Sequence, residues 1–204
     1  NIGQNAMIPA LAMQIFKILN EKETNHFEMF QYQLFGACFE IQDEILRDLI
    51  QPQNQALQIK LSLSEGVHIE GLHRERALGI DQLTKIFDDA INTRTNHALP
   101  TGAGLDTSCC VAEIVLRQQE HEGGVARNSE CKLVVVDVPA TDKLVQSVDV
   151  LRRLEGATMN QSLLTLADVF RSLANTQVAP GAPYRASKLT HYLQEMIGGN
   201  AIVL

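Results

Sequence analysis

The chain has 204 residues, of which 45% are hydrophobic and 20% are charged, and its formal net charge at pH 7 is −7. This composition is typical of a folded globular protein, and we expect a single domain over residues 1–204. The negative charge argues against non-specific binding to nucleic acid or to an anionic membrane surface, and no apolar run approaches the length of a membrane span.

The cysteines and histidines show no spacing typical of a metal site or a disulfide framework. The four cysteines are Cys38, Cys109, Cys110 and Cys131. Without a C-x-x-C pair we expect reduced thiols and a location in the cytoplasm, and Cys109 and Cys110 are predicted to pack at the start of a strand. The chain begins at Asn1 and ends within an apolar run at residues 201–204, so we expect it to be part of a longer protein.

The first half of the chain alternates between helical and extended patterns. In chain order it predicts a helix at 7–22, a strand at 26–39, a charged amphipathic segment at 40–50, short strands and turns around Gly66 and Gly71 at 57–72, and a helix at 80–95. The two helices are predicted from apolar residues at helical spacing, and the strand at 26–39 from its aromatic residues.

The second half continues this alternation. It predicts a loop at 99–110, strands at 111–116 and 133–138, a polar turn-rich connection at 121–130 that suits a hairpin, an amphipathic helix through Leu163, Leu166, Val169, Phe170 and Leu173, and a last helix at 187–197. The last helix is expected to stop at Gly198-Gly199 with a left-handed C-cap. Mixed helices and strands in this order indicate an α/β layered fold.

Four segments resemble the kinesin motor domain. PYRASKLTHYLQEMIGGN at residues 183–200 resembles P-Y-R-D-S-K-L-T…L-G-G-N of kinesins, with a difference at Ala186. EIQDEILRDLI at 40–50 is similar to E-I-Y-N-E-x-I-x-D-L-L, and NQSLLTLADVFRSLA at 160–174 to N-K-S-L-x-A-L-G-x-V-I-x-A-L. KLVVVDVPATD at 132–142 lies where kinesins carry K-L-x-L-V-D-L-A-G-S-E. The resemblance covers nearly the whole chain.

This resemblance implies a kinesin-motor-like fold of the P-loop NTPase superfamily, in which a central mixed sheet carries helices on both faces. The domain is expected to be incomplete at both ends, without the P-loop part or the neck and tail. The resemblance also implies the microtubule as a partner, with Tyr184, Arg185, Lys188 and His191 as candidate contacts. The alternative is that this stretch is kept only for its turn and helix cap.

One substitution in this segment and a pair of arginines upstream of it affect this expectation. Many kinesins carry arginine where this chain has His191, which is mostly neutral at pH 7, so contact with acidic tubulin is expected to be weaker. Arg152 and Arg153 fall in residues 144–156, the position of the kinesin loop before the tubulin-facing helix. Contact with tubulin tails and a solvated helix end are equally good interpretations of these two arginines.

The nucleotide-site motifs of the family are altered. G-x-x-x-x-G-K-[ST] is absent and would lie upstream of residue 1. The motif N-x-x-S-S-R-S-H falls on GAGLDTSC at residues 102–109, where only Ser108, at the position that touches magnesium in the family, matches. In D-V-P-A-T-D at residues 137–142, Asp137 is kept, Ala140 replaces the glycine that senses the γ-phosphate, and Asp142 replaces the glutamate.

Because phosphoryl transfer needs all of these groups together, we expect a pseudo-ATPase. Asp137 is then a satisfied carboxylate at a strand end rather than a magnesium acid, and Ser108 has the alternative role of a turn residue. We expect no cofactor; a P-loop upstream would change this expectation to Mg-ATP or Mg-ADP.

The function implied is a structural microtubule-associated domain of the cytoskeleton, for example in the axoneme of a cilium, where other axonemal proteins would be further partners. One alternative is an active microtubule-dependent ATPase with its P-loop upstream of residue 1. A third state would hold nucleotide without hydrolysis.

Overall fold

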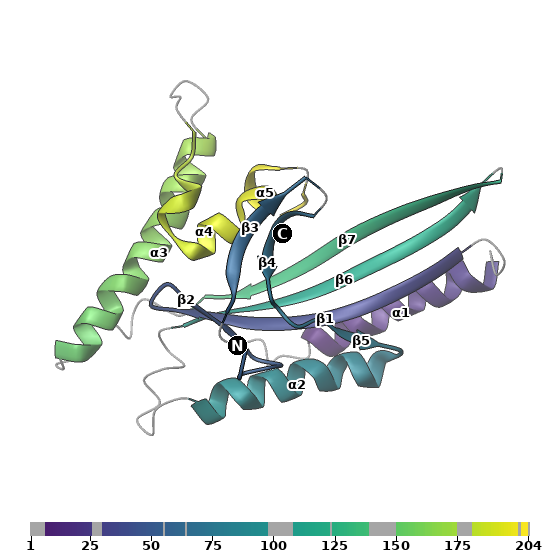
Figure 1. Cartoon of the computed structure of the whole chain (residues 1–204), viewed down its shortest axis with the longest axis horizontal. Helices are drawn as coiled ribbons and strands as arrows, with labels where there is room; N and C mark the ends of the chain where they lie inside the picture. Colours follow the sequence, from purple (N-terminus) through teal and green to yellow (C-terminus); the bar gives the residue numbers. More distant parts are fainter. Residues whose placement is uncertain are drawn as a thin grey trace.

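The main sheet of the protein is antiparallel and carries helices on both faces (Figure 1). The computed structural model describes residues 7–25, 30–54, 56–63, 65–97, 108–122, 124–138, 150–174, 181–199 and 201–203. The sheet is built of β1 (Phe30–Gln42), β2 (Ile45–Asp48), β5 (Glu75–Ala77), β6 (Cys109–Glu122) and β7 (Val125–Asp137). Its strand order is β2-β1-β6-β7, with β5 also paired to β1, and each of these pairings is antiparallel. The α/β prediction is confirmed.

Helices α1 (Met7–Asn25) and α2 (Ile80–His97) cover one face of this sheet. Leu83, Phe87 and Ala90 of α2 are spaced to lie on one side of the helix, and all three are buried against β1 and β6. Gly36 of β1 lets the helix approach closely, because a Cβ there would lie 3.1 Å from Cγ2 of Ile86. The predicted helices at 7–22 and 80–95 are confirmed.

The opposite face carries the small sheet of β3 (Gln58–Ser62) and β4 (Gly66–Glu70), together with the C-terminal helices α4 (Lys188–Tyr192) and α5 (Gln194–Gly198). Helix α3 (Val150–Ala174) lies beside α4 (Figure 1). The predicted turns at Gly66 and Gly71 are confirmed, since both glycines adopt positive φ, 64° and 85°. None of the described helices is long and apolar enough to span a membrane.

The β6–β7 hairpin is much longer than its sequence predicts. Residues 121–130 are largely strand rather than a turn-rich connection, and Gly124, with φ 82°, lies at the turn. The prediction was wrong because β7 is exposed on both of its faces over residues 125–131, so the polar side chains there show no apolar alternation. Cross-strand pairs such as Arg117 Nε to Glu130 Oε2 at 2.7 Å connect the two strands instead. The predicted loop likewise ends earlier, at Ser108.

The C-terminal region differs from prediction in three ways. The helix predicted at 187–197 is divided at Leu193 into α4 and α5, although Ser187 does cap it by accepting a hydrogen bond from Thr190 N at 3.2 Å. Gly199 has φ −104° and is extended, so the predicted left-handed C-cap is wrong. Helix α3 begins at Val150, inside the segment that was predicted to be a loop.

The apolar face predicted for the helix around residues 163–173 is only partly buried. Val169 is fully buried, whereas Phe170 and Leu173 are 47% and 41% exposed. The side chains of residues 150–161, Arg152 and Arg153 among them, lie outside the described part of the structure.

Candidate functional site

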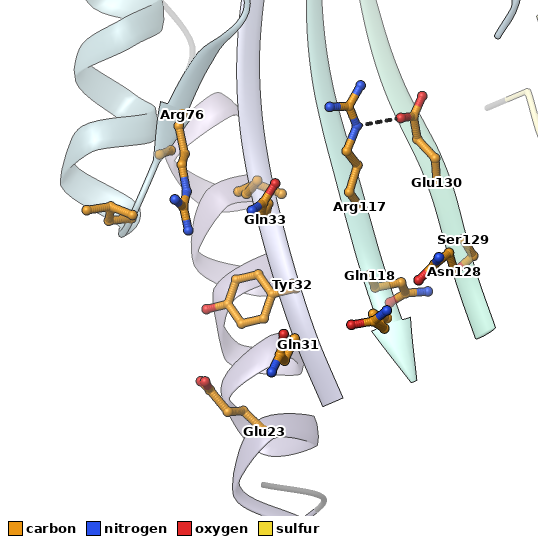
Figure 2. A pocket seen from close by; sticks show the side chains of 14 residues that line it. Glu23, Gln31, Tyr32, Gln33, Arg76, Arg117, Gln118, Asn128, Ser129 and Glu130 are labelled. Carbon is orange, nitrogen blue, oxygen red and sulfur yellow. Dashed lines mark hydrogen bonds and ion pairs between the residues drawn. The ribbon is translucent and has the colours of Figure 1, made fainter. Parts of the chain in front are cut away.

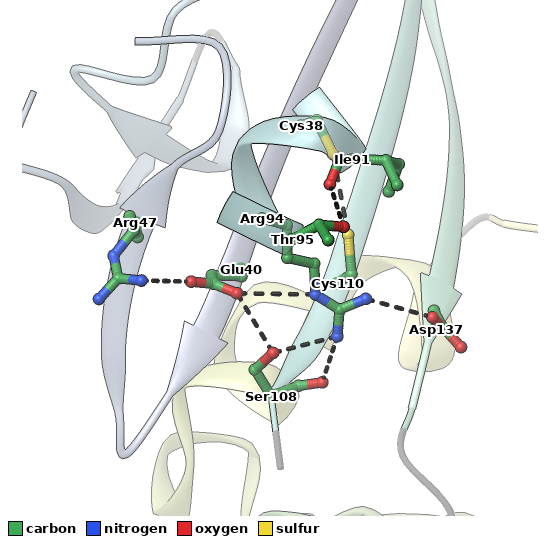
Figure 3. A network of polar contacts seen from close by, with 9 residues as sticks. All are labelled: Cys38, Glu40, Arg47, Ile91, Arg94, Thr95, Ser108, Cys110 and Asp137. Carbon is green, nitrogen blue, oxygen red and sulfur yellow. Dashed lines mark hydrogen bonds and ion pairs between the residues drawn. The ribbon is translucent and has the colours of Figure 1, made fainter. Parts of the chain in front are cut away.

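Arg94, in the last turns of α2, is the centre of a polar network that joins three strands (Figure 3). Its Nη2 donates hydrogen bonds to the backbone carbonyl of Ser108 over 2.8 Å and to Ser108 Oγ over 3.0 Å. Its Nη1 lies 3.4 Å from Asp137 Oδ2, and its Nε lies 3.6 Å from Glu40 Oε2. The side chain of Arg94 is buried, so the positive charge is held within the protein rather than in water.

The register of the sheet explains why these residues meet. Glu40 of β1 lies opposite Cys110 of β6, and Cys110 lies opposite Asp137 of β7, so the three form one row across the strands. Ser108 directly precedes β6. Since residues in a row across antiparallel strands point to the same face, Glu40 and Asp137 both face α2, which delivers Arg94.

The charges in this network are balanced. Glu40 also accepts a hydrogen bond from Arg47 Nη1 over 2.7 Å, and Ser108 Oγ donates to Glu40 Oε2 over 3.2 Å. Two guanidinium groups, of Arg47 and Arg94, therefore face the two carboxylates of Glu40 and Asp137. A buried ion pair is tolerated only when both charges have partners of this kind.

These contacts test whether the described residues fit a magnesium ion. Ser108 Oγ is engaged by Glu40 and Arg94, and the Asp137 carboxylate faces the same guanidinium cation. The described residues at this position therefore fit an internal ion-pair network and not a divalent cation. No cluster of three or more His, Cys, Asp or Glu side chains suited to a metal ion occurs elsewhere in the described ranges.

The structure places the predicted nucleotide-site residues only in part. Ser108 and Asp137 come together through Arg94, whereas Ala140 and Asp142 lie outside the described residues. Cys109, at the histidine position of the motif, is buried at the start of β6, as predicted. Burial raises the pKa of its thiol to about 11, so it is a neutral thiol at pH 7.

The second group of predicted residues lies on the other face of the sheet. Tyr184 and Arg185 belong to the short 3-10 helix η2 (Tyr184–Ala186), and Lys188 and His191 to α4. Arg185 is exposed, and the other three are half-buried. The segment is thus a turn with two fixed positive charges next to a capped helix.

Glu44 fixes the position of this segment. It lies in the turn between β1 and β2 with φ 60°, where its carboxylate accepts hydrogen bonds from Lys188 N over 2.5 Å and from Ser162 Oγ over 2.7 Å. The Glu44 side chain therefore ties the main sheet to the start of α4 and to Ser162 of α3.

His191 is neutral in this setting. Burial lowers the pKa of its imidazole, and the positive charges of Arg185 and Lys188 lower it further. At pH 7 the segment therefore presents the charges of Arg185 and Lys188 without a third from His191.

A buried carboxylate, not predicted from the sequence, lies beneath α4. Glu113 of β6 is fully buried and accepts a hydrogen bond from the hydroxyl of Tyr192. Arg74 Nε lies 3.4 Å and Lys132 Nζ 3.9 Å from its carboxylate oxygens. Burial raises the pKa of Tyr192 well above its usual value, and the negative charge of Glu113 raises it further.

A cavity among the described residues lies away from both groups. It has a volume of about 780 Å³ and is lined by α1, β1, β5, β6 and β7, including Glu23, Tyr32, Arg76, Arg117 and Glu130 (Figure 2). None of the predicted site residues lines it, so it adds nothing to the two groups described above.

Comparisons with known proteins agree on one family. The sequence model described as "Kinesin motor domain" matches residues 2–204. The chain is 30% identical over 167 residues to kinesin-like protein KIF18A of Mus musculus, covering 80% of this chain and 19% of that protein. It is 27% identical over 207 residues to kinesin-related protein 1 of Dictyostelium discoideum, covering 97% and 9%.

Solved structures show the same fold. The structure of a fast kinesin superimposes with a TM-score of 0.79 at 28% identity, covering 95% of this chain and 53% of that chain. The motor domain of the Kar3-like kinesin from Ashbya gossypii has a TM-score of 0.75 at 22% identity, which is a likeness of fold alone; it covers 97% and 59%. The chain spans less than a quarter of the length of either curated relative and little more than half of either solved chain.

Proposed function

The chain belongs to the kinesin motor domain family, and on this premise we propose that it is a microtubule-binding structural domain in which ATP hydrolysis is lost or weak. It would act as a fixed part of a cytoskeletal assembly, of which the axoneme of a cilium is one example. The observation that carries this proposal is the Arg94 network, because it occupies the two residues that match the family's nucleotide-site motifs.

The contacts of the motif residues support the part of the proposal that concerns ATP hydrolysis. A hydrolytic site needs groups that are free to bind the metal and to sense the γ-phosphate. Here Ser108 and Asp137 are held by one guanidinium, and a neutral, buried Cys109 stands at the histidine position. Loss of one member of a cooperative catalytic set commonly lowers turnover by factors of a hundred or more.

The microtubule side is supported by the placement of Arg185 and Lys188. Both lie on the face of the sheet that carries α3 and α4, and Glu44 anchors the backbone of Lys188. Fixed positive charges on an ordered turn are suited to an acidic protein surface. None of these contacts involves the Arg94 network, so we expect microtubule binding that does not depend on nucleotide.

The second candidate is an active microtubule-dependent ATPase with its P-loop upstream of residue 1. The observation that favours it is that Ser108 and Asp137, the two matching positions, lie together at the ends of adjacent strands. The two candidates differ in one respect: an active motor couples microtubule affinity to its nucleotide, and a structural domain does not.

The test is cosedimentation of the full-length protein with microtubules in the presence of ATP, of ADP, or of no nucleotide. We expect the same affinity in all three, and weaker binding for the double variant Arg185→Ala/Lys188→Ala. Lys85→Ala is the matched control, since Lys85 is exposed on α2, which lies on the opposite face of the sheet. Affinity that changes several-fold between ATP and ADP would favour the active motor, and absence of binding would refute the tubulin contact.

A further inference from the structure

Two cysteines that lie far apart in the sequence meet in the core. The Sγ atoms of Cys38 on β1 and Cys110 on β6 are 3.8 Å apart, and both side chains are fully buried (Figure 3). In the register of the two strands Cys38 lies opposite Ala112, and Cys110 opposite Glu40. The cysteines are therefore diagonal neighbours on the face of the sheet that α2 covers.

The surroundings of the two thiols make them chemically unequal. The thiol–thiol hydrogen bond lowers the pKa of Cys110, and the positive charge of Arg94 lowers it further, against burial, which raises it. The same hydrogen bond raises the pKa of Cys38, and burial adds to this effect. Because the two sulfur atoms are in contact, a sulfur that is oxidised to a sulfenic acid already has the second thiol within reach to complete the bond.

We propose that Cys38 and Cys110 form an oxidisable dithiol, a modification site that hydrogen peroxide converts into a reversible cross-strand disulfide. The Cys110 thiolate attacks one peroxide oxygen and becomes a sulfenic acid as the O–O bond breaks, and the first water is released. The Cys38 sulfur then attacks the Cys110 sulfur and displaces the second water. Both thiol protons leave in the two waters, and the peroxide accepts the two electrons.

Access of hydrogen peroxide to the two buried thiols sets the rate of this reaction. The last turns of α2 cover the face of the sheet that holds the thiols, and Ile91 packs against the same core (Figure 3). Oxidation therefore requires a local opening of this helix end, so the reaction is slower than oxidation of Cys131, which is exposed. Closing the bond draws the sulfur atoms from 3.8 Å to about 2 Å. Because diagonal neighbours lie about 7–8 Å apart, the bond also pulls the backbones of β1 and β6 together next to Glu40 and Ser108.

The test is peroxide treatment of the native full-length protein, followed by alkylation of the remaining thiols, digestion and mass spectrometry. We expect a linked peptide pair joining Cys38 to Cys110, lighter by two hydrogens and released by a dithiol reductant. The Cys131→Ser and Cys109→Ser variants are expected to form the same link, because Cys131 is exposed and Cys109 points to the other face of the sheet.

The wild-type protein alone decides the outcome, so a failure of core variants to fold does not affect it. If Cys38 and Cys110 stay alkylatable after Cys131 is fully oxidised, or if the link forms only after unfolding in urea, the proposal is wrong. The Cys38→Ala variant gives a second measurement: it must lose the link, and a linked peptide that joins Cys110 to another cysteine in this variant would contradict the pairing. This inference is independent of the microtubule proposal.

Discussion

Arg94 Nη2 donates a hydrogen bond to Ser108 Oγ over 3.0 Å, at a position where the family resemblance assigns the serine to magnesium. Arg94 belongs to α2, Ser108 directly precedes β6, and Asp137 is the last residue of β7. The contact therefore lies at the edge of the sheet where β6 begins and β7 ends. Because Arg94 carries a permanent positive charge, its pairing with Glu40 and Asp137 does not depend on pH near neutrality.

Replacement of Arg94 by alanine should strongly destabilise the protein. The change leaves Glu40, Ser108 and Asp137 without their central partner, and breaking a buried charge pair in this way costs about 3–5 kcal/mol. The expected result is a clear decrease in the urea midpoint of unfolding, followed by fluorescence or circular dichroism.

The matched control for this variant is Arg171→Ala. Arg171 forms an exposed ion pair with Asp168 at 2.8 Å, and such pairs contribute about 0–1 kcal/mol. Equal effects of Arg94→Ala and Arg171→Ala would contradict the central role given to Arg94.

Removal of the hydroxyl of Tyr192, the last residue of α4, should also lower the free energy of unfolding. Tyr192→Phe deprives the buried carboxylate of Glu113 of a donor, which costs about 1–3 kcal/mol when the remaining group stays buried. Tyr32→Phe is the control, since Tyr32 is half-buried on the other face of the sheet. The free energy of unfolding from urea titration would show the difference; a Tyr192→Phe protein as stable as Tyr32→Phe would rule out the contribution.

The same tyrosine predicts how stability changes at high pH. Burial, and then Glu113, raise the pKa of Tyr192 above the value of 10.0 that applies to the unfolded chain. Below pH 10 both states are protonated; above it the unfolded chain loses this proton first, so stability falls as pH rises toward the folded pKa. Urea midpoints measured on either side of pH 10 should fall more for the wild type than for Tyr192→Phe. Parallel pH curves for the two proteins would contradict this prediction.

Restoring a positive charge at position 191 should strengthen microtubule binding. His191 is neutral because burial, Arg185 and Lys188 lower its pKa, so His191→Arg adds a fixed charge. An exposed ion pair of about 0.5–1 kcal/mol corresponds to a two- to five-fold gain in affinity, roughly, and this gain should shrink at high salt. The control is Asn92→Arg, which adds the same charge at an exposed position of α2 on the other face of the sheet; a gain with both variants would indicate a non-specific charge effect.

The sequence predicted α1, α2 and the family well because their signals are local. The helical stripe of α2 and the segment at 183–200 are both read from neighbouring residues. The long β6–β7 hairpin was missed because its outer half is polar on both faces, and the division of the last helix at Leu193 carries no proline or glycine signal.

Arg94 was missed although a signal was present. The buried stripe of α2 runs through Leu83, Phe87 and Ala90, and Arg94 continues it at the next position of the same face. An arginine at the end of an apolar stripe predicts a buried charge that needs carboxylate partners. Which carboxylates these are depends on the strand register, which joins Glu40 to Asp137 across 97 positions of sequence and which no local pattern shows.

ATP turnover by the full-length protein, measured with and without saturating microtubules, tests the central proposal most directly. We expect turnover near the level of a control without enzyme, and no increase when microtubules are added, because Ser108 and Asp137 are held by Arg94. Hydrolysis that rises many-fold with microtubules would contradict the account and identify the protein as an active motor.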